Sequence, residues 1–136
     1  MSLLYRAIGY LCVGITAEVF FTGLKALIRE KNYAMHGFTT LWMVPIYGIL
    51  VPLGFEPLAG YIIDWPWYLR GITYAVLILV TEYLAATLYK VILKENPWEY
   101  TTGWHLHGKI RFDYFPFWFV FGLGLEELSQ FFLRIF

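Results

Sequence analysis

The stretch LVTEYLAATLYKVILKEN, residues 79–96, decides the fold class. It is an apolar run that ends in charged residues, and Glu82 lies inside the run. Extended back to Trp67, the run is long enough to cross a bilayer, which takes roughly 20 residues of helix. A charged carboxylate inside such a helix costs about 3 kcal/mol or more, so it usually faces other helices and serves structure or function.

The composition of the chain supports a membrane setting. Of the 136 residues, 60% are hydrophobic, 21% aromatic and 15% charged, with a mean hydropathy of +0.59. A soluble domain of this size needs more polar surface, so lipid is the expected solvent. The formal net charge is zero, which argues against a nucleic-acid partner. The single cysteine, Cys12, excludes an intrachain disulfide and a cysteine-based zinc site.

Four apolar segments are expected to span the membrane, at about 2–27, 39–61, 67–93 and 109–135. Pro45 and Pro52 are expected to kink the second span. A turn is expected at 56–66, and the long polar interruption at 96–108 has aromatic residues typical of the membrane interface. The predicted fold is an all-α polytopic membrane protein, with residues 1–136 forming a single membrane domain.

The lysines and arginines predict the orientation. The helix ends facing the first and third connections hold more of them than the opposite ends, so these connections are expected in the cytoplasm and both termini outside. In a prokaryote the host would be the cytoplasmic membrane. The first group contains Lys25, Arg29, Lys31, Lys90, Lys94, Lys109 and Arg111, and the second contains Arg6, Arg70 and Arg134.

The two halves of the sequence align as a tandem repeat. We predict repeat one at about 2–61 and repeat two at about 67–135, each with two helices. The repeats would be related by a parallel pseudo-two-fold axis along the membrane normal. With one insertion of seven residues, the aligned pairs are Glu18 and Glu82, Asn32 and Asn96, His36-Gly37 and His107-Gly108, Pro45 and Pro116, and Glu56 and Glu127.

This alignment places two pairs of glutamates at two levels of the expected four-helix bundle. Glu18 and Glu82 are each about ten residues from a cytoplasmic helix end, or roughly 15 Å deep, near the middle of the bilayer. Two carboxylates that share a site favour protonation of one of them, which suits proton coupling or ion binding. Glu56 and Glu127 would lie at the outer mouth. In the alternative interpretation, the glutamates bond tyrosines or helix ends and stabilise the bundle.

A second polar cluster is expected on the cytoplasmic side. The spacing of His105 and His107 is too common to indicate a metal site, and neither a metal nor another cofactor is expected. Arg111 is expected to pair with Asp113, and together with Lys109 it could bind lipid phosphate. The cluster contains His36, Lys94, Glu99, Tyr100, His105, His107, Lys109, Arg111 and Asp113.

The sequence lacks catalytic signatures. Ser2 and Ser129 are its only serines, which disfavours a serine nucleophile. Gly122 and Gly124 lie in an apolar run with no strand before them. They therefore indicate close helix packing rather than nucleotide binding.

Four sequence features together resemble one family. They are the glutamate of the first span, HGFTTLWMVPIYG at 36–48, TEYL at 81–84 and PWEY at 97–100. Over about residues 5–134 the chain resembles the bacterial CmpB-like ABC-transporter type IV membrane proteins, and it is similar to the vertebrate transmembrane protein 229 group. The resemblance implies a role in transport. The matched positions are Glu18, Gly37, Trp42, Pro45, Tyr47, Gly48, Glu82, Pro97, Trp98, Glu99, Tyr100 and Gly108.

The sequence favours a small permease, or an ion- or proton-linked transporter or channel subunit, over an enzyme. Glu18 and Glu82 would form the central site, and no catalytic residue is expected. Two alternatives stay open: a structural or assembly subunit of a larger membrane complex, and a lipid-modifying enzyme that uses the cytoplasmic cluster. The bilayer is the expected partner, with a homodimer or a larger complex also open. The loop residues expected to matter are His36, Gly37, Trp42, Pro45, Tyr47, Pro97, Trp98, Glu99, Tyr100, His107 and Arg111.

Overall fold

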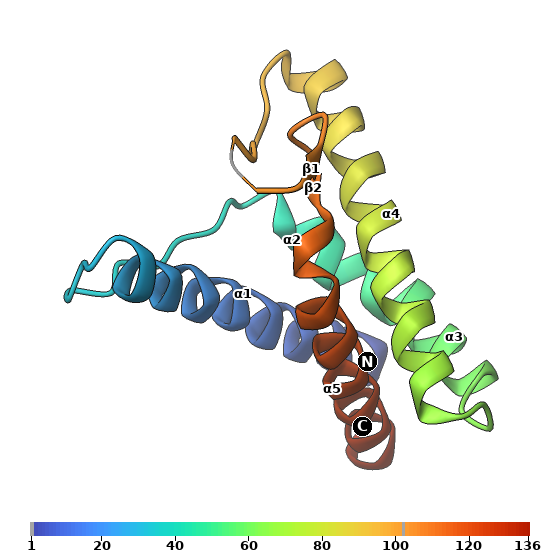
Figure 1. Ribbon diagram of the computed structural model, residues 1–136. Helices are drawn as coiled ribbons and strands as arrows, with labels where there is room; N and C mark the ends of the chain where they lie inside the picture. The colour runs from blue at the N-terminus through green and yellow to red at the C-terminus, as the bar shows by residue number, and fades with distance from the viewer. Residues whose placement is uncertain (1, 102) are drawn as a thin grey trace. The chain divides into compact units, whose positions relative to one another are not determined.

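The computed structural model describes residues 2–101 and 103–136, and most of them are helical (Figure 1). A short β-hairpin adds to the predicted all-α fold. In chain order the elements are α1 (Ser2–Arg29), α2 (Met43–Pro45), the π-helical segment η1 (Ile46–Phe55), α3 (Glu56–Tyr61), α4 (Trp67–Leu93), β1 (His105–Leu106), β2 (Ile110–Arg111), the 3-10 turn η2 (Phe112–Tyr114) and α5 (Phe115–Ile135).

Three helical runs in the described residues are long and apolar enough to cross a membrane. They are α1, the continuous run Met43–Tyr61 formed by α2, η1 and α3, and α4. Large apolar side chains stay exposed on these runs, among them Phe20, Leu84 and Val91. Such a surface is suited to lipid rather than water. Helix α5, which carries two adjacent glutamates, is not among the three, so the fourth span stays a prediction.

The second helical run departs from a regular α-helix around Pro52. Proline has no N–H and cannot complete the α-helical hydrogen bond to the carbonyl four residues earlier. Residues 46–55 are π-helical instead, and at their end the Glu56 N–H bonds to the Val51 carbonyl, five residues back. Such adjustments keep a proline-containing membrane helix continuous. The turn predicted at 56–66 is therefore wrong for its first part, because α3 continues the helix to Tyr61.

The chain divides into two compact units, which are described separately. Unit 1 comprises Met1–Leu58 and Phe132–Phe136. In unit 1, the Tyr47 ring of η1 occupies the space that a β-carbon at Gly14 of α1 would need. Phe132 packs on Tyr10 with ring centroids 5.1 Å apart, and its ring also covers Gly9. The glycines of α1 thus let aromatic rings approach its backbone closely.

The loop after α1 folds back onto that helix. The Asn32 N–H donates to the Ala26 carbonyl at 3.0 Å while Lys31 has a φ of 54°, an arrangement that closes the helix end. Further along, the Phe38 N–H donates to the Thr22 hydroxyl at 2.8 Å. These bonds fix the loop that leads into α2.

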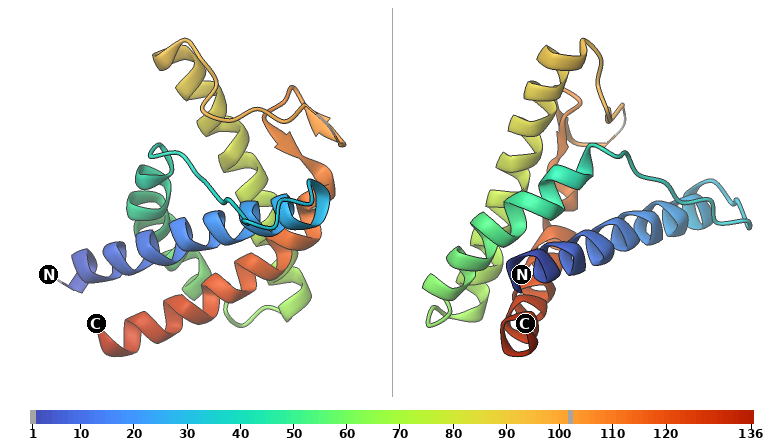
Figure 2. Two further views of the ribbon diagram at one scale, coloured as in Figure 1. Left: turned by 90° about the vertical axis from the view of Figure 1, so that its left-hand side faces the viewer. Right: turned by 180° about the vertical axis from the view of Figure 1, so that it is seen from behind.

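Unit 2 comprises Ala59–Phe131. Its hairpin is antiparallel, with His105 opposite Arg111. His107 and Gly108 both have positive φ, 55° and 71°, and the Lys109 N–H closes the turn on the Leu106 carbonyl at 3.0 Å. Figures 1 and 2 show the hairpin beside the second half of α4 and leading into α5.

Helices α4 and α5 meet through a glycine on each side. A β-carbon at Gly71 of α4 would overlap the ring of Phe119, and one at Gly122 of α5 would overlap the β-carbon of Tyr74. A β-carbon at Gly124 would have no atom within 4 Å apart from its chain neighbours and the backbone of its own helix. The interpretation of the α5 glycines as packing residues is therefore confirmed for Gly122, whereas Gly124 faces open space.

The two glycines provide a matched test of this packing. Gly122→Ala is expected to lower the free energy of unfolding by about 1–3 kcal/mol, because the Tyr74 β-carbon is fixed to its backbone and cannot rotate away. Gly124→Ala is expected to raise it by about 0.5–1 kcal/mol, because alanine favours the helix more than glycine. Unfolding by SDS in mixed micelles measures both, and equal losses of stability would contradict the described contact.

Candidate functional site

Four glutamates on the helical runs receive hydrogen bonds from side chains distant in sequence, and they fall into two kinds. Glu56 and Glu126 each bond an arginine and a tyrosine. Glu18 and Glu82 each bond a tyrosine. The partners of each glutamate lie in the same unit as the glutamate.

In unit 1, Arg6 and Tyr10 reach Glu56 from one face of α1. The two residues are one helical turn apart, so their side chains are neighbours. The Arg6 Nε donates to both carboxylate oxygens at 3.1 Å, and the Tyr10 hydroxyl donates to Oε2. The side chains of Arg6 and Glu56 are 14% and 7% exposed. The Glu56 charge is therefore compensated by a cation in a mostly buried ion pair that joins the start of α1 to α3.

Unit 2 contains the same arrangement. Arg70 and Tyr74 are one turn apart on α4, and both bond Glu126 of α5. The Arg70 Nε lies 3.2 Å and 2.9 Å from the two carboxylate oxygens. Its Nη1 also donates to the carbonyls of Ile63 and Trp65, before α4 begins. Glu126 is almost fully buried, so this ion pair ties α5 to the first turn of α4.

Glu18 lies near the middle of α1 and has a neutral partner. The Tyr47 hydroxyl donates to its Oε1 at 2.9 Å, and the Tyr47 side chain is buried. In the described part of the chain, Glu18 forms no ion pair with a lysine, arginine or histidine. The phenol offers a hydrogen bond without a compensating charge.

Glu82 of α4 is bonded by a residue of the loop that follows the helix. The Tyr100 hydroxyl donates to Oε1 of this buried carboxylate at 2.7 Å. The loop is held at the backbone, because the Tyr100 N–H donates to the Gly108 carbonyl at 2.8 Å. The Trp98 indole N–H donates to the Lys109 carbonyl at 3.1 Å. The PWEY motif thus fastens the loop to the hairpin and brings a hydroxyl to Glu82.

The polar side chains of the hairpin bind it to α4. The Tyr83 hydroxyl bonds the His107 Nδ1 at 2.8 Å. The Lys109 ammonium donates to the Thr87 hydroxyl at 2.9 Å and lies 4.7 Å from the centre of the Tyr83 ring. These contacts give His107 and Lys109 a structural role at this end of α4.

Arg111 is buried although it lies at the end of β2. It bonds Asp113 in two places and donates to the Tyr114 hydroxyl at 2.9 Å, with its guanidinium 4.3 Å from that ring. The predicted Arg111–Asp113 pair is confirmed. The hydrogen bond to Asp113 holds the pKa of Arg111 above its ordinary value. Gly103, with a φ of 76°, leaves room for the guanidinium.

The two glutamates predicted at the outer mouth have different surroundings. Glu56 is buried against Arg6, whereas Glu127 is exposed. Its neighbour Glu126 is the residue that pairs with Arg70. An ion-binding role for Glu127 stays a prediction.

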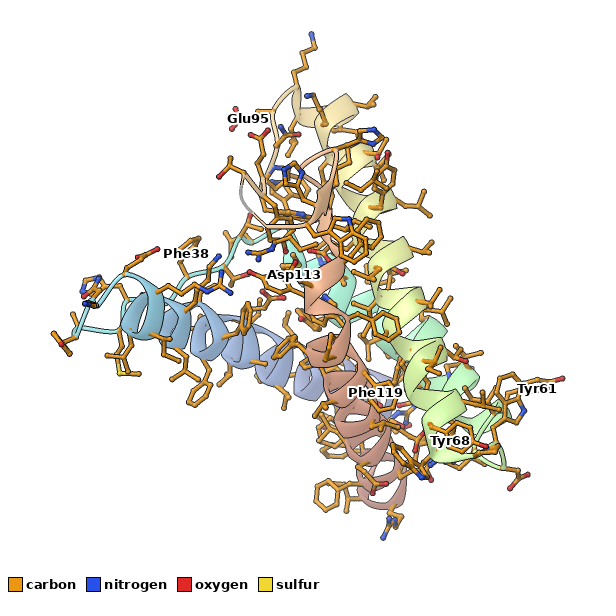
Figure 3. All side chains as sticks on the ribbon, in the orientation of Figure 1. Phe38, Tyr61, Tyr68, Glu95, Asp113 and Phe119 are labelled. Carbon is orange, nitrogen blue, oxygen red and sulfur yellow. The ribbon has the colours of Figure 1, made fainter. Side chains whose placement is uncertain are left out.

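Other predicted loop residues lie outside these contacts. His36 and Glu99 are exposed, Trp42 precedes α2, Pro45 ends α2 and Pro97 follows α4. Gly37 lies against the Val19 carbonyl of α1. Asp113, in the turn η2, and Glu95, beyond the end of α4, are labelled in Figure 3. Among the described residues, no group of three His, Cys, Asp or Glu side chains could hold a metal.

Sequence reasoning missed the arginine–tyrosine partners, although a signal for them exists. Arg6 lies 64 positions before Arg70, and Tyr10 lies 64 positions before Tyr74. The same spacing separates Glu18 from Glu82. A constant spacing across three charged or polar positions is the kind of signal by which a sequence repeat is recognised. The missed residues are Arg6, Tyr10, Arg70, Tyr74 and Glu126.

Adjacent glutamates of α5 test the ion pair. Glu126→Gln is expected to lower the free energy of unfolding by about 3 kcal/mol, because it leaves the Arg70 charge mostly buried without its counter-ion. Glu127→Gln is expected to change it by less than about 0.5 kcal/mol, because the side chain is exposed. SDS unfolding of both variants measures the difference, and a larger loss for Glu127→Gln would contradict the assignment.

One family is shown by comparison with known proteins. The sequence model of the family described as "Putative ABC-transporter type IV" matches residues 7–135. No curated protein and no solved structure matches the chain. The resemblance to the bacterial family is thereby confirmed, and the likeness to the vertebrate transmembrane protein 229 group stays a prediction. With its three apolar helical runs, the chain is an integral membrane protein that belongs to the family "Putative ABC-transporter type IV".

Proposed function

We propose that the chain is a permease, transporter or channel subunit in which Glu18 and Glu82 take up and release a proton or a cation. The difference between the two kinds of glutamate carries this proposal. Glu56 and Glu126 are compensated by arginines, so they have little tendency to exchange a cation. Glu82 receives a hydrogen bond from a phenol, that of Tyr100. Glu18 is likewise bonded by a phenol, that of Tyr47, which adds no positive charge, and it forms no ion pair in the described part of the chain. In lipid, such a group favours a proton or a cation.

We assign Glu56 and Glu126 a structural role on the same grounds. A mostly buried carboxylate with an arginine and a tyrosine bonded to it is expensive to separate from them. We keep the exposed Glu127 as a proposed ion-binding residue at the outer mouth. The proposed subunit therefore holds its helices with one set of glutamates and exchanges ions with another.

We also propose that the chain has four spans built from two tandem repeats, with α5 as the fourth span. Matched positions on α1 and α4 support the duplication, because Arg6, Tyr10 and Glu18 each have a counterpart 64 residues on. Each arginine–tyrosine pair bonds a glutamate on the second helical run of its unit. The Lys and Arg distribution supports the proposed orientation, with the connections after α1 and α4 in the cytoplasm.

The second helices differ by one residue, and the π-helical segment accounts for the difference. Eleven positions separate Pro45 from Glu56, and ten separate Pro116 from Glu126. A π-helical turn contains more residues than an α-helical turn, so η1 can absorb one extra residue and keep Glu56 on the face toward α1. If the two helices are aligned at a constant spacing from Pro45 and Pro116, Glu56 is therefore matched to Glu127 instead of Glu126.

A structural or assembly subunit is the second candidate. It is favoured by the hydrogen bonds that all four glutamates receive inside the chain, because such bonds also stabilise a bundle. A lipid-modifying enzyme has less support, because Tyr100 and His107 are both engaged in holding the loop and hairpin to α4.

Ion flux separates the two candidates. In proteoliposomes with an imposed pH gradient and membrane potential, Glu18→Gln and Glu82→Gln are each expected to reduce proton or cation flux by at least about tenfold. Glutamine can still accept the tyrosine hydrogen bond, so both variants should stay folded. Dye-reported proton flux and isotope uptake of Na⁺ and K⁺ are measured in parallel.

Two exposed glutamates serve as matched controls. Glu30, after α1, and Glu95, after α4, lie beyond the helices that carry the proposed site. Glu30→Gln and Glu95→Gln are expected to leave flux within about twofold of the original. Absence of flux in the original chain, together with large stability losses in Glu18→Gln and Glu82→Gln, would favour the structural subunit.

Single-residue deletions test the proposed duplication. Removing the exposed Ile49 of η1 is expected to be tolerated, because ten positions then separate Pro45 from Glu56, as in α5. Removing the exposed Val120 of α5 should rotate Glu126 by about 100° away from Arg70 and destabilise the chain. SDS unfolding of the two deletions provides the measurement. If both destabilise equally, η1 does not absorb an extra residue.

A further inference from the structure

Two tyrosines, one in each unit, deliver a hydroxyl to the glutamates of the proposed site. Tyr47 lies in VPIYG at 44–48, within a helical run, and Tyr100 ends PWEY at 97–100, within a loop. The two positions do not correspond in the repeat alignment, because Tyr47 follows the His36-Gly37 pair whereas Tyr100 precedes His107-Gly108. The units thus make the same contact from different segments.

Tyr47 is fixed by its surroundings. Its ring fills the space left by Gly14, one helical turn before Glu18 on α1, and its side chain is 5% exposed. The hydroxyl ends 2.9 Å from the Glu18 Oε1. Between residues 43 and 55, the segments α2 and η1 have no other titratable side chain. Tyr47 is therefore the one titratable residue that α2 and η1 can offer to Glu18.

Tyr100 is fixed by the hairpin. Its N–H bonds the carbonyl of Gly108, and its ring packs edge-on against Tyr114 with centroids 5.8 Å apart. Arg111 donates to the Tyr114 hydroxyl and pairs with Asp113. Tyr100 thus connects Glu82 to the network of Tyr114, Arg111 and Asp113. A charged network lies beside the Tyr100 ring, whereas the Tyr47 ring packs against Gly14 of α1.

We infer that Tyr47 and Tyr100 are positioning residues whose hydroxyls hold the Glu18 and Glu82 carboxylates in the orientation that exchanges the proton or cation. This inference rests on the proposed function for its role in transport, but the two contacts can be tested without flux. The VPIYG and PWEY motifs then each provide a tyrosine hydroxyl that orients a glutamate. Hydrogen bonds to charged or buried carboxylates are among the stronger ones in proteins, so their loss should be measurable.

The test uses Tyr47→Phe and Tyr100→Phe in the reconstituted full chain, with Tyr83→Phe as the matched control. Tyr83→Phe removes a hydroxyl from α4 that bonds His107 and not a glutamate. Infrared spectroscopy reports the carboxyl stretching bands, which are assigned by their disappearance in Glu18→Gln and Glu82→Gln. The Glu18 band is expected to shift to higher frequency in Tyr47→Phe, and the Glu82 band in Tyr100→Phe. In Tyr83→Phe both bands are expected to stay unchanged.

Flux is measured on the same samples. Tyr47→Phe and Tyr100→Phe are each expected to reduce it by about tenfold. Gly14→Ala is a second way to disturb Tyr47, since it displaces the ring and keeps the hydroxyl. It should shift the Glu18 band and leave the Glu82 band unchanged.

The outcomes separate the two proposals. Shifted bands in a chain that carries no flux would support the hydrogen-bond assignment and overturn the transport role. Normal flux with unshifted bands in both phenylalanine variants would overturn the positioning inference and leave the proposed function standing. Equal band shifts in Tyr83→Phe would also overturn the inference, because the effect would not be specific to the two hydroxyls.

Discussion

The ion pair between an arginine on the first helix of each unit and a glutamate on the second is the interaction on which the rest of the structure depends. Lipid solvates apolar side chains as well as a protein core does, so apolar contact alone gives helices little reason to associate. Arg6 with Glu56 and Arg70 with Glu126 supply a directional bond that lipid cannot replace. Tyr74 and Tyr10, one turn further along, add a second donor to each carboxylate.

Close packing of the helices accompanies these hydrogen bonds and ion pairs. Arginine and tyrosine can reach a carboxylate on a neighbouring helix only if the backbones approach closely, and glycines permit this approach. In unit 2, Gly122 lies directly against Tyr74, the same tyrosine that bonds Glu126. In unit 1, Gly14 admits the ring of Tyr47, whose hydroxyl reaches Glu18. The small residues and the polar contacts are therefore parts of one arrangement.

In the proposed function, one kind of glutamate holds the helices together and the other exchanges a proton or a cation. A carboxylate locked to an arginine keeps its charge and its place, which suits a structural element. A carboxylate bonded by a phenol keeps a defined orientation, and the bond itself adds no positive charge to compete with a proton or cation. The family match supports a transport setting for this proposal, while the hydrogen bonds and ion pairs supply the chemical distinction.

The sequence by itself determined the membrane class, three of the spanning runs and the family, because apolar length and local motifs are properties of contiguous residues. Only the tertiary structure decided that Glu126, and not Glu127, meets Arg70. Adjacent residues on a helix point about 100° apart, so the packing of α5 against α4 decides which of the two glutamates faces Arg70. It also decided the partners Arg6 and Tyr47, because contacts across 50 and 29 residues depend on how two helices pack, which no local pattern records.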